Sequence, residues 1–140
     1  MSYERSAGIL IFRQLAEGRE YLLLHYPGGH FDFPKGHMEK DETERETAMR
    51  ELIEETGIDE ITWIEGYREK IHYFYRRGEK LMSKDVIFFL ARTRQKKVTL
   101  SFEHKGSAWL PYKEALEKLT FSSAKELLKK AEKFLKRSEG

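Results

Sequence analysis

Residues 36–58 read GHMEKDETERETAMRELIEETGI, and this segment decides the fold. Thr43 followed three residues later by Glu46 is the capping-box signature of a helix start. Gly57 is placed to end that helix in a left-handed conformation. Between these points, four apolar residues recur at helical spacing and predict one face that packs on a core: Ala48, Met49, Leu52 and Ile53.

The same helix carries a group of carboxylates. At about 100° per residue, Glu51, Glu54 and Glu55 fall within an arc of ~100°, predicted to lie opposite the apolar stripe. Like charges this close repel one another, and a hard divalent cation would remove that penalty. A solvated, Glu-rich surface is the alternative for three glutamates alone. The pattern favours metal-assisted phosphoryl chemistry, because such ions polarise phosphoryl oxygens and lower the pKa of bound water.

The window as a whole resembles the Nudix box. That pattern is Gly, five residues, Glu, seven residues, then Arg-Glu-aliphatic-any-Glu-Glu-any-Gly-aliphatic, and its length makes it specific. The matching residues are Gly36, Glu42, Arg50, Glu51, Leu52, Glu54, Glu55, Gly57 and Ile58. The resemblance implies an α/β/α sandwich with a mixed β-sheet and a hydrolase that cleaves phosphoanhydride bonds of nucleoside-diphosphate-linked substrates.

The resemblance also implies roles for individual residues. Glu51, Glu54, Glu55 and the Gly36 carbonyl are the implied ligands of Mg²⁺, for which Mn²⁺ is a possible substitute. Arg50 is implied to orient the neighbouring carboxylates, with Glu42 as its partner. One glutamate is implied to act as the base, and the catalytic group is expected to comprise Glu54, Glu51, Glu103 and Arg50.

The residues that precede the box resemble one branch of this family. Phe31 to His37 (FDFPKGH) is similar to the Trp-Asp-Phe-Pro-Lys-Gly-His run of asymmetrical diadenosine tetraphosphate hydrolases, with Phe31 in place of Trp. Lys35 is expected to supply a point charge for a phosphate, and His37 to bind phosphate or act as an acid. The alternatives are a surface lysine and a loop histidine.

A downstream segment extends this resemblance. Residues 101–105 (SFEHK) and 108–110 (AWL) are similar to the Ser-x-Glu-His segment and the Trp-Leu strand of the same branch. Glu103 is implied to be a further metal ligand or base from outside the helix. His104 is a candidate substrate-binding residue, with simple packing as its alternative.

Two phenylalanines are candidates for binding a base. In the branch, a Tyr after a Lys-x-Val-x motif helps to sandwich the adenine, and Phe88 of Lys84–Phe88 (KDVIF) stands in that place. Phe121 lies where a second aromatic is expected. Aromatic stacking contributes ~1–3 kcal/mol per base. The alternative for both is a core position, which is common for Phe.

The rest of the chain predicts a single α/β domain over residues 1–140. Strands are expected at 6–12, 20–26, 61–63, 67–75, 81–91 and 106–110, with a structured loop at 30–40. A short helix is expected at 113–118, and a last helix begins at Ser122 or Ser123. Its apolar face comprises Leu127, Leu128, Ala131, Phe134 and Leu135. This order predicts a mixed sheet covered by helices on both faces.

Composition excludes several other classes. The chain has no Cys, which excludes disulfides and thiolate chemistry, and a net charge of only +2, which disfavours a nucleic-acid partner. No apolar run long enough to span a membrane and no secretory signal are recognisable, so a soluble cytoplasmic protein, monomer or homodimer, is expected. The absence of Asn and the two Gln residues give a thermophile-like composition, or reflect drift in a short chain.

Two alternatives to a diadenosine tetraphosphatase releasing ATP and AMP stay open. One is a Nudix pyrophosphatase acting on ADP-ribose, a nucleoside triphosphate, capped RNA or a diphosphoinositol phosphate. The other is a non-catalytic nucleotide-binding module of the same fold. Complete retention of the box carboxylates argues against the second alternative.

Overall fold

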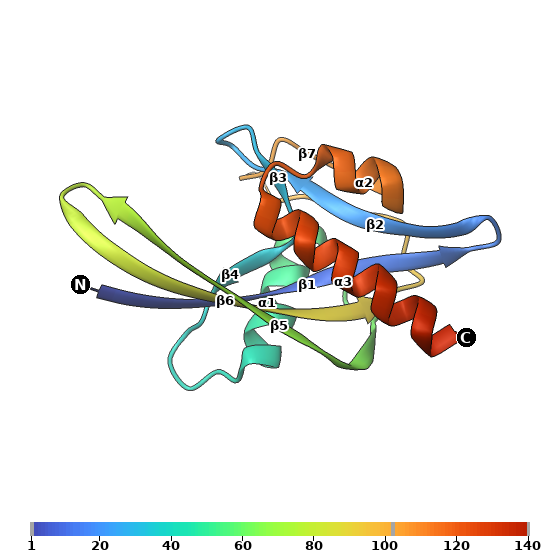
Figure 1. Cartoon of the computed structure of the whole chain (residues 1–140), viewed down its shortest axis with the longest axis horizontal. Helices are drawn as coiled ribbons and strands as arrows, with labels where there is room; N and C mark the ends of the chain where they lie inside the picture. The colour runs from blue at the N-terminus through green and yellow to red at the C-terminus, as the bar shows by residue number, and fades with distance from the viewer. Residues whose placement is uncertain (1, 102, 140) are drawn as a thin grey trace.

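The computed structural model describes residues 2–101 and 103–139 (Figure 1). Its elements, in chain order, are β1 (Ser2–Leu15), β2 (Gly18–His25), β3 (Phe31–Asp32), β4 (Lys35–His37), α1 (Glu44–Thr56), β5 (Thr62–Arg77), β6 (Lys80–Arg92), β7 (Gly106–Pro111), α2 (Tyr112–Lys118) and α3 (Ser122–Glu139).

The long strand β1 organises the sheet. It pairs in parallel with β6 and antiparallel with β2 and β4, so the sheet is mixed, as predicted. The order across the sheet is β3-β2-β1-β6-β5, with β4 also on β1 and β7 also on β2. Beyond the body of the molecule, the β5–β6 hairpin and the start of β1 project together as a twisted ribbon (Figure 1).

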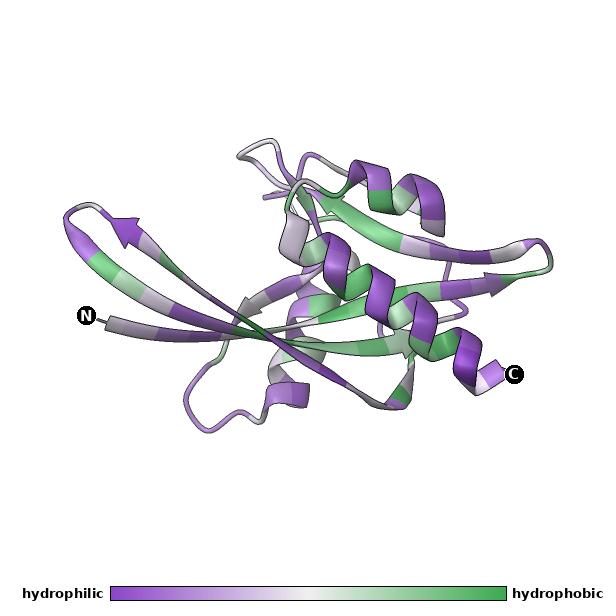
Figure 2. Cartoon of the chain, in the orientation of Figure 1, coloured by the Kyte–Doolittle hydropathy of each residue, from purple (hydrophilic) through white to green (hydrophobic). Residues whose placement is uncertain are grey.

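Alternating residues of β1 supply the two sides of the core, because successive strand side chains point to opposite faces. Ile9 and Ile11 belong to the cluster that includes Leu52 of α1. Leu10 belongs to the cluster that includes Leu128 of α3, and Figure 2 shows hydrophobic residues recurring along that helix. Helices therefore cover both faces, which confirms the predicted α/β/α sandwich.

Helix α1 begins and ends as its local sequence predicts. Thr43 and Glu46 form a complete capping box, and Gly57 has φ 74° and donates its N–H to the Ile53 carbonyl. The predicted apolar stripe is partly wrong, because Ile53 is exposed while Glu55 is buried. A Cβ on Gly36 would lie 2.0 Å from Cδ of Glu51, so β4 approaches the carboxylate-bearing side of the helix directly.

Two very short strands were not predicted. β3 and β4 lie inside the 30–40 segment and exist because they pair with β2 and β1. The strands predicted at 61–63 and 67–75 form one strand, β5, with a register shift between Trp63 and Arg68. Of the helices within residues 2–101 and 103–139, none has the length and apolar character that crossing a bilayer requires.

Candidate active site

The site is built where β4 meets α1. Lys35 and Gly36 pair with Gly8 and Ala7 of the central strand, so their backbone is held by the core of the sheet. A Cβ on Gly8 would lie 2.4 Å from the Pro34 carbonyl oxygen. Glycine at position 8 therefore lets the Pro34 backbone approach β1, and glycine at position 36 leaves room for the Glu51 side chain against β4.

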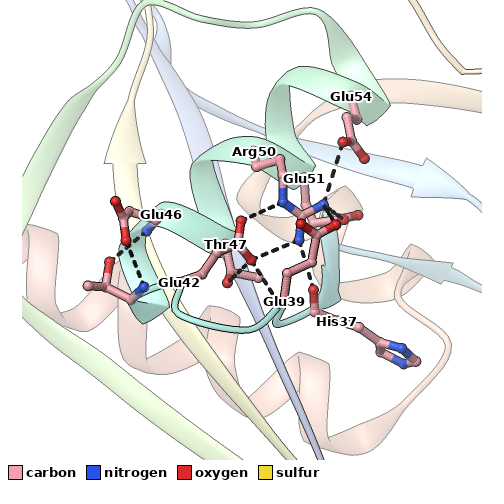
Figure 3. A network of polar contacts seen from close by, with 9 residues as sticks. His37, Glu39, Glu42, Glu46, Thr47, Arg50, Glu51 and Glu54 are labelled. Atoms are coloured by element: carbon pink, nitrogen blue, oxygen red, sulfur yellow. Dashed lines mark hydrogen bonds and ion pairs between the residues drawn. The ribbon is translucent and has the colours of Figure 1, made fainter.

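Arg50 organises the carboxylates on one side of the site (Figure 3). Its Nε lies 2.6 Å from Glu42 Oε2, and its Nη1 lies 2.6 Å from Glu51 Oε2 and 3.5 Å from Glu54 Oε1. The guanidinium hydrogen bond holds the pKa of the Glu42 carboxyl at about 2. Arg50 thus supplies positive charge and a rigid donor fork to three carboxylates at once.

Glu55 lies on the other, buried side. One of its oxygens, Oε1, accepts a hydrogen bond from the Lys35 backbone N–H at 3.1 Å. Burial, then repulsion by Glu51 and by Glu103, raises the pKa of Glu55 to about 8. Burial also raises the pKa of Glu51. Two acidic groups are therefore held in a poorly solvated place where an added positive charge would be favourable.

The carboxylates of Glu51, Glu54 and Glu55 fit a hard divalent cation by their chemistry, although the three side chains do not point to one common position. In the described ranges, 2–101 and 103–139, no three Asp, Glu or His side chains meet closely enough to form a ready-made metal site. Arg50 draws Glu51 and Glu54 to one side, while the Lys35 N–H holds Glu55 on the other. The donors are carboxylate oxygens, which Mg²⁺ prefers.

A pocket of about 360 Å³ opens between β5, β6 and the start of α3, and Lys35 connects it to Glu55. Lys35 lines it and pairs there with Asp32, at 3.0 Å between Nζ and Oδ2. Lys35 thus links the two halves of the site: its backbone contacts Glu55, and its side chain enters the pocket.

Three aromatic residues line this pocket in different ways. Phe88 is 1% exposed and packs edge-on against Phe33, with its ring also against Gly8, so it belongs to the core. Phe121 is 45% exposed at the start of α3. Tyr73 is 37% exposed on β5, and its position in the sequence did not mark it as a site residue. An open stacking surface is therefore offered by Tyr73 and Phe121, whereas the burial of Phe88 favours the core alternative, with its ring at the floor of the pocket.

Lys84 is a second residue that the sequence alone did not single out. It lies beside Tyr73 in the β5–β6 register and is half-buried. Burial, then repulsion by Lys35, lowers its pKa. Nearby Glu4 is engaged by Arg77 and His37, and Asp32 by Lys35, so among the described residues Lys84 has no ion-pair partner. The signal in the sequence was the Lys-x-Val motif.

The two histidines of the expected site take unexpected positions. The His37 carbonyl accepts from Arg50, but its imidazole points away from the carboxylates (Figure 3) and lies 3.2 Å from Glu4. The His104 side chain is 2% exposed beside Glu55, which favours packing, the alternative stated for it, over substrate contact. Glu103 is exposed and acts on the Glu55 pKa through its charge, whereas Phe102 lies outside the described residues.

Comparison with known proteins finds a family model and several relatives that match this chain. The NUDIX domain profile matches residues 2–131. The mouse bis(5'-nucleosyl)-tetraphosphatase (asymmetrical) is 36% identical over 143 residues, covering 94% of this chain and 95% of that protein. A binary complex of the Caenorhabditis elegans Ap4A hydrolase superposes with a TM-score of 0.83 at 34% identity, over 94% of this chain and 97% of that one. The dihydroneopterin triphosphate pyrophosphohydrolase of Escherichia coli, at 20% identity and a TM-score of 0.71, shares the fold.

Proposed function

The chain belongs to the Nudix hydrolase family, and from that premise we propose that it hydrolyses diadenosine tetraphosphate asymmetrically to ATP and AMP in the presence of Mg²⁺. The observation that carries the proposal is the double role of Lys35. Its backbone N–H binds Glu55 and its side chain lines the pocket, so a nucleotide held in that pocket places its phosphates beside the carboxylates.

Tyr73 and Phe121 are proposed to hold one adenine. Both rings are partly exposed at the pocket, on β5 and at the start of α3. Stacking on a base contributes ~1–3 kcal/mol. Lys35 and Lys84 are proposed to neutralise the polyphosphate, and Lys84 suits this role because it is half-buried without a carboxylate partner among the described residues.

Glu51, Glu55, the Gly36 carbonyl and Glu103 are proposed to hold the metal. Mg²⁺ bound there would polarise phosphoryl oxygens and lower the pKa of a bound water. Arg50 keeps the Glu51 carboxylate oriented through its 2.6 Å contact. Glu54 is proposed to accept the proton of the attacking water, since its side chain is 58% exposed and is held only at 3.5 Å.

Product analysis tests the proposal. The protein is incubated with Mg²⁺ and diadenosine tetraphosphate, and in parallel with ADP-ribose and nucleoside triphosphates. The proposal expects equal amounts of ATP and AMP, no ADP, and no turnover in excess chelator. Two ADP per substrate, or rapid cleavage of ADP-ribose with diadenosine tetraphosphate untouched, would refute this specificity. Full turnover in chelator would refute the metal site.

A further inference from the structure

The His104 imidazole is packed between α1, which carries Glu55, and the C-terminal end of β2. Its Nε2 lies 3.7 Å from Glu55 Oε2, with side-chain exposures of 2% and 11%. The Tyr26 ring covers it in a T-shaped contact at 4.8 Å. The other Glu55 oxygen is held by the Lys35 N–H. Each oxygen of Glu55 is therefore approached by a different group, Oε1 by the Lys35 backbone N–H and Oε2 by the His104 imidazole.

The loop that carries His104 is itself attached to the end of α1. The backbone N–H of Ser101 donates to the Glu55 carbonyl at 3.4 Å, and that of His104 donates to the Ser101 carbonyl at 3.2 Å. Lys105 N–H donates to the His25 carbonyl at 2.9 Å. These bonds tie the loop to both α1 and β2, so the imidazole is held in place by backbone on each side.

Ser101 contacts the ring nitrogen that faces away from Glu55. Its Oγ lies 2.9 Å from His104 Nδ1. When the hydroxyl donates to Nδ1, the ring proton resides on Nε2 and points at the Glu55 carboxylate. Such a partner fixes the orientation of a ligating carboxylate, and its loss typically costs 10–100-fold in metal affinity. Contacts of this kind are often longer than hydrogen bonds in proteins without ligand and tighten on binding.

We infer that His104, held by Ser101, is a positioning residue that orients the Glu55 carboxylate for a divalent cation. It touches neither substrate nor metal. The inference rests on the proposed function, because it assumes that Glu55 is a metal ligand. The Ser-x-Glu-His segment therefore contributes to the site in two ways: it carries Glu103, and its His104 orients the carboxylate of Glu55.

A matched pair of amide substitutions tests this role. In His104→Gln the side-chain N–H falls near the position of Nε2, so the contact to Glu55 is kept. In His104→Asn it falls near Nδ1, so the contact to Ser101 is kept and that to Glu55 is lost. Mn²⁺ binding is measured on the protein alone by electron paramagnetic resonance. We expect the Gln variant to bind within about threefold of wild type and the Asn variant ~10–100-fold more weakly.

The melting temperature of both variants is also measured in EDTA. A lower melting temperature there reports lost packing, whereas a weaker Mn²⁺ affinity reports lost positioning of the Glu55 carboxylate. Equal metal affinity for the two variants, whether normal or equally reduced, overturns the inference. If the Asn variant does not fold, Ser101→Ala replaces it, and an unchanged Mn²⁺ affinity there overturns the inference too. Because no substrate is used, a wild type that binds Mn²⁺ but leaves diadenosine tetraphosphate intact refutes the proposed function and not this positioning role.

Discussion

Glu54 and Glu55 are adjacent in the chain and yet sit in opposite environments. The Glu54 side chain is 58% exposed, whereas Glu55 is buried against Lys35 and His104. Environment, rather than residue type, therefore separates the two proposed roles of proton acceptor and metal ligand. A pair of isosteric substitutions at these positions distinguishes the roles.

Glu54→Gln is expected to lower kcat by ~10²–10⁴-fold while Mn²⁺ binding stays near normal, the range typical of losing a general base. Glu55→Gln is expected to lower kcat by ~10³-fold or more and to weaken Mn²⁺ binding as well. Turnover and metal titration on both variants check this. Normal metal affinity in Glu55→Gln would show that the metal has been placed wrongly.

The raised pKa of Glu55 makes a second prediction, on the metal-free protein. Its carboxyl shifts from an ordinary 4.5 to about 8, so between these values the folded state keeps a proton that the unfolded state releases. The free energy of unfolding therefore falls as pH rises through that window. Glu55→Gln removes the effect. Melting in EDTA should show the variant more stable than wild type near pH 8, and much less so near pH 5. An equal difference in melting temperature between variant and wild type at the two pH values would contradict the raised pKa of Glu55.

At the scale of elements, local chemistry explains what the sequence predicted. The caps of α1 depend on Thr43, Glu46 and Gly57 alone, and they form as expected. The strands β3 and β4 could not be predicted, because two or three residues become a strand only through pairing with β2 and β1. The exposure of Ile53 likewise depends on which side of α1 the sheet covers, which the helical spacing of the sequence does not give.

The pocket illustrates the same limit. Tyr73 lines it, and Lys84, eleven positions further along the chain, becomes the neighbour of Tyr73 only through the β5–β6 register. A motif placed Phe88 and Phe121 in the site, but burial separates their roles, since one ring is 1% exposed and the other 45%. The three glutamates of α1 were predictable because helical spacing alone makes them neighbours, whereas the separation of their side chains by Arg50 and the Lys35 N–H was not.

The different burial of these aromatic rings predicts different outcomes for three alanine substitutions. Tyr73→Ala and Phe121→Ala should each raise KM by ~5–150-fold with little change in kcat or melting temperature, since stacking contributes ~1–3 kcal/mol. Phe88→Ala should instead cost ~3–5 kcal/mol of stability, as for a buried aromatic. Kinetics and thermal melting on the three variants check this. A normal KM for both exposed-ring variants would remove them from the adenine site.

At the scale of the whole molecule, α3 must stay docked for the pocket to exist, because its first turn lines that pocket. Its docking combines an apolar face with a buried polar contact to β2 farther along the helix. Arg19 Nη2 lies 3.0 Å from Glu132 Oε1, and the Tyr21 hydroxyl donates to Glu132 Oε2 at 2.5 Å. The Arg19 and Glu132 side chains are only 7% and 11% exposed.

Glu132→Ala leaves the Tyr21 hydroxyl buried without its acceptor and leaves Arg19 only its contacts with Glu139 and Gln14, which is expected to cost ~1–3 kcal/mol. Glu126 offers a matched control on the same helix, because its contact with Lys129 is solvent-exposed at 63% and 51%. Glu126→Ala should cost ~0–1 kcal/mol. Urea unfolding of both variants measures the difference. Equal costs would mean that the apolar face alone docks α3. A large cost for Glu132→Ala, with KM unchanged well below the melting temperature, would show that the polar contact stabilises the molecule without shaping the pocket.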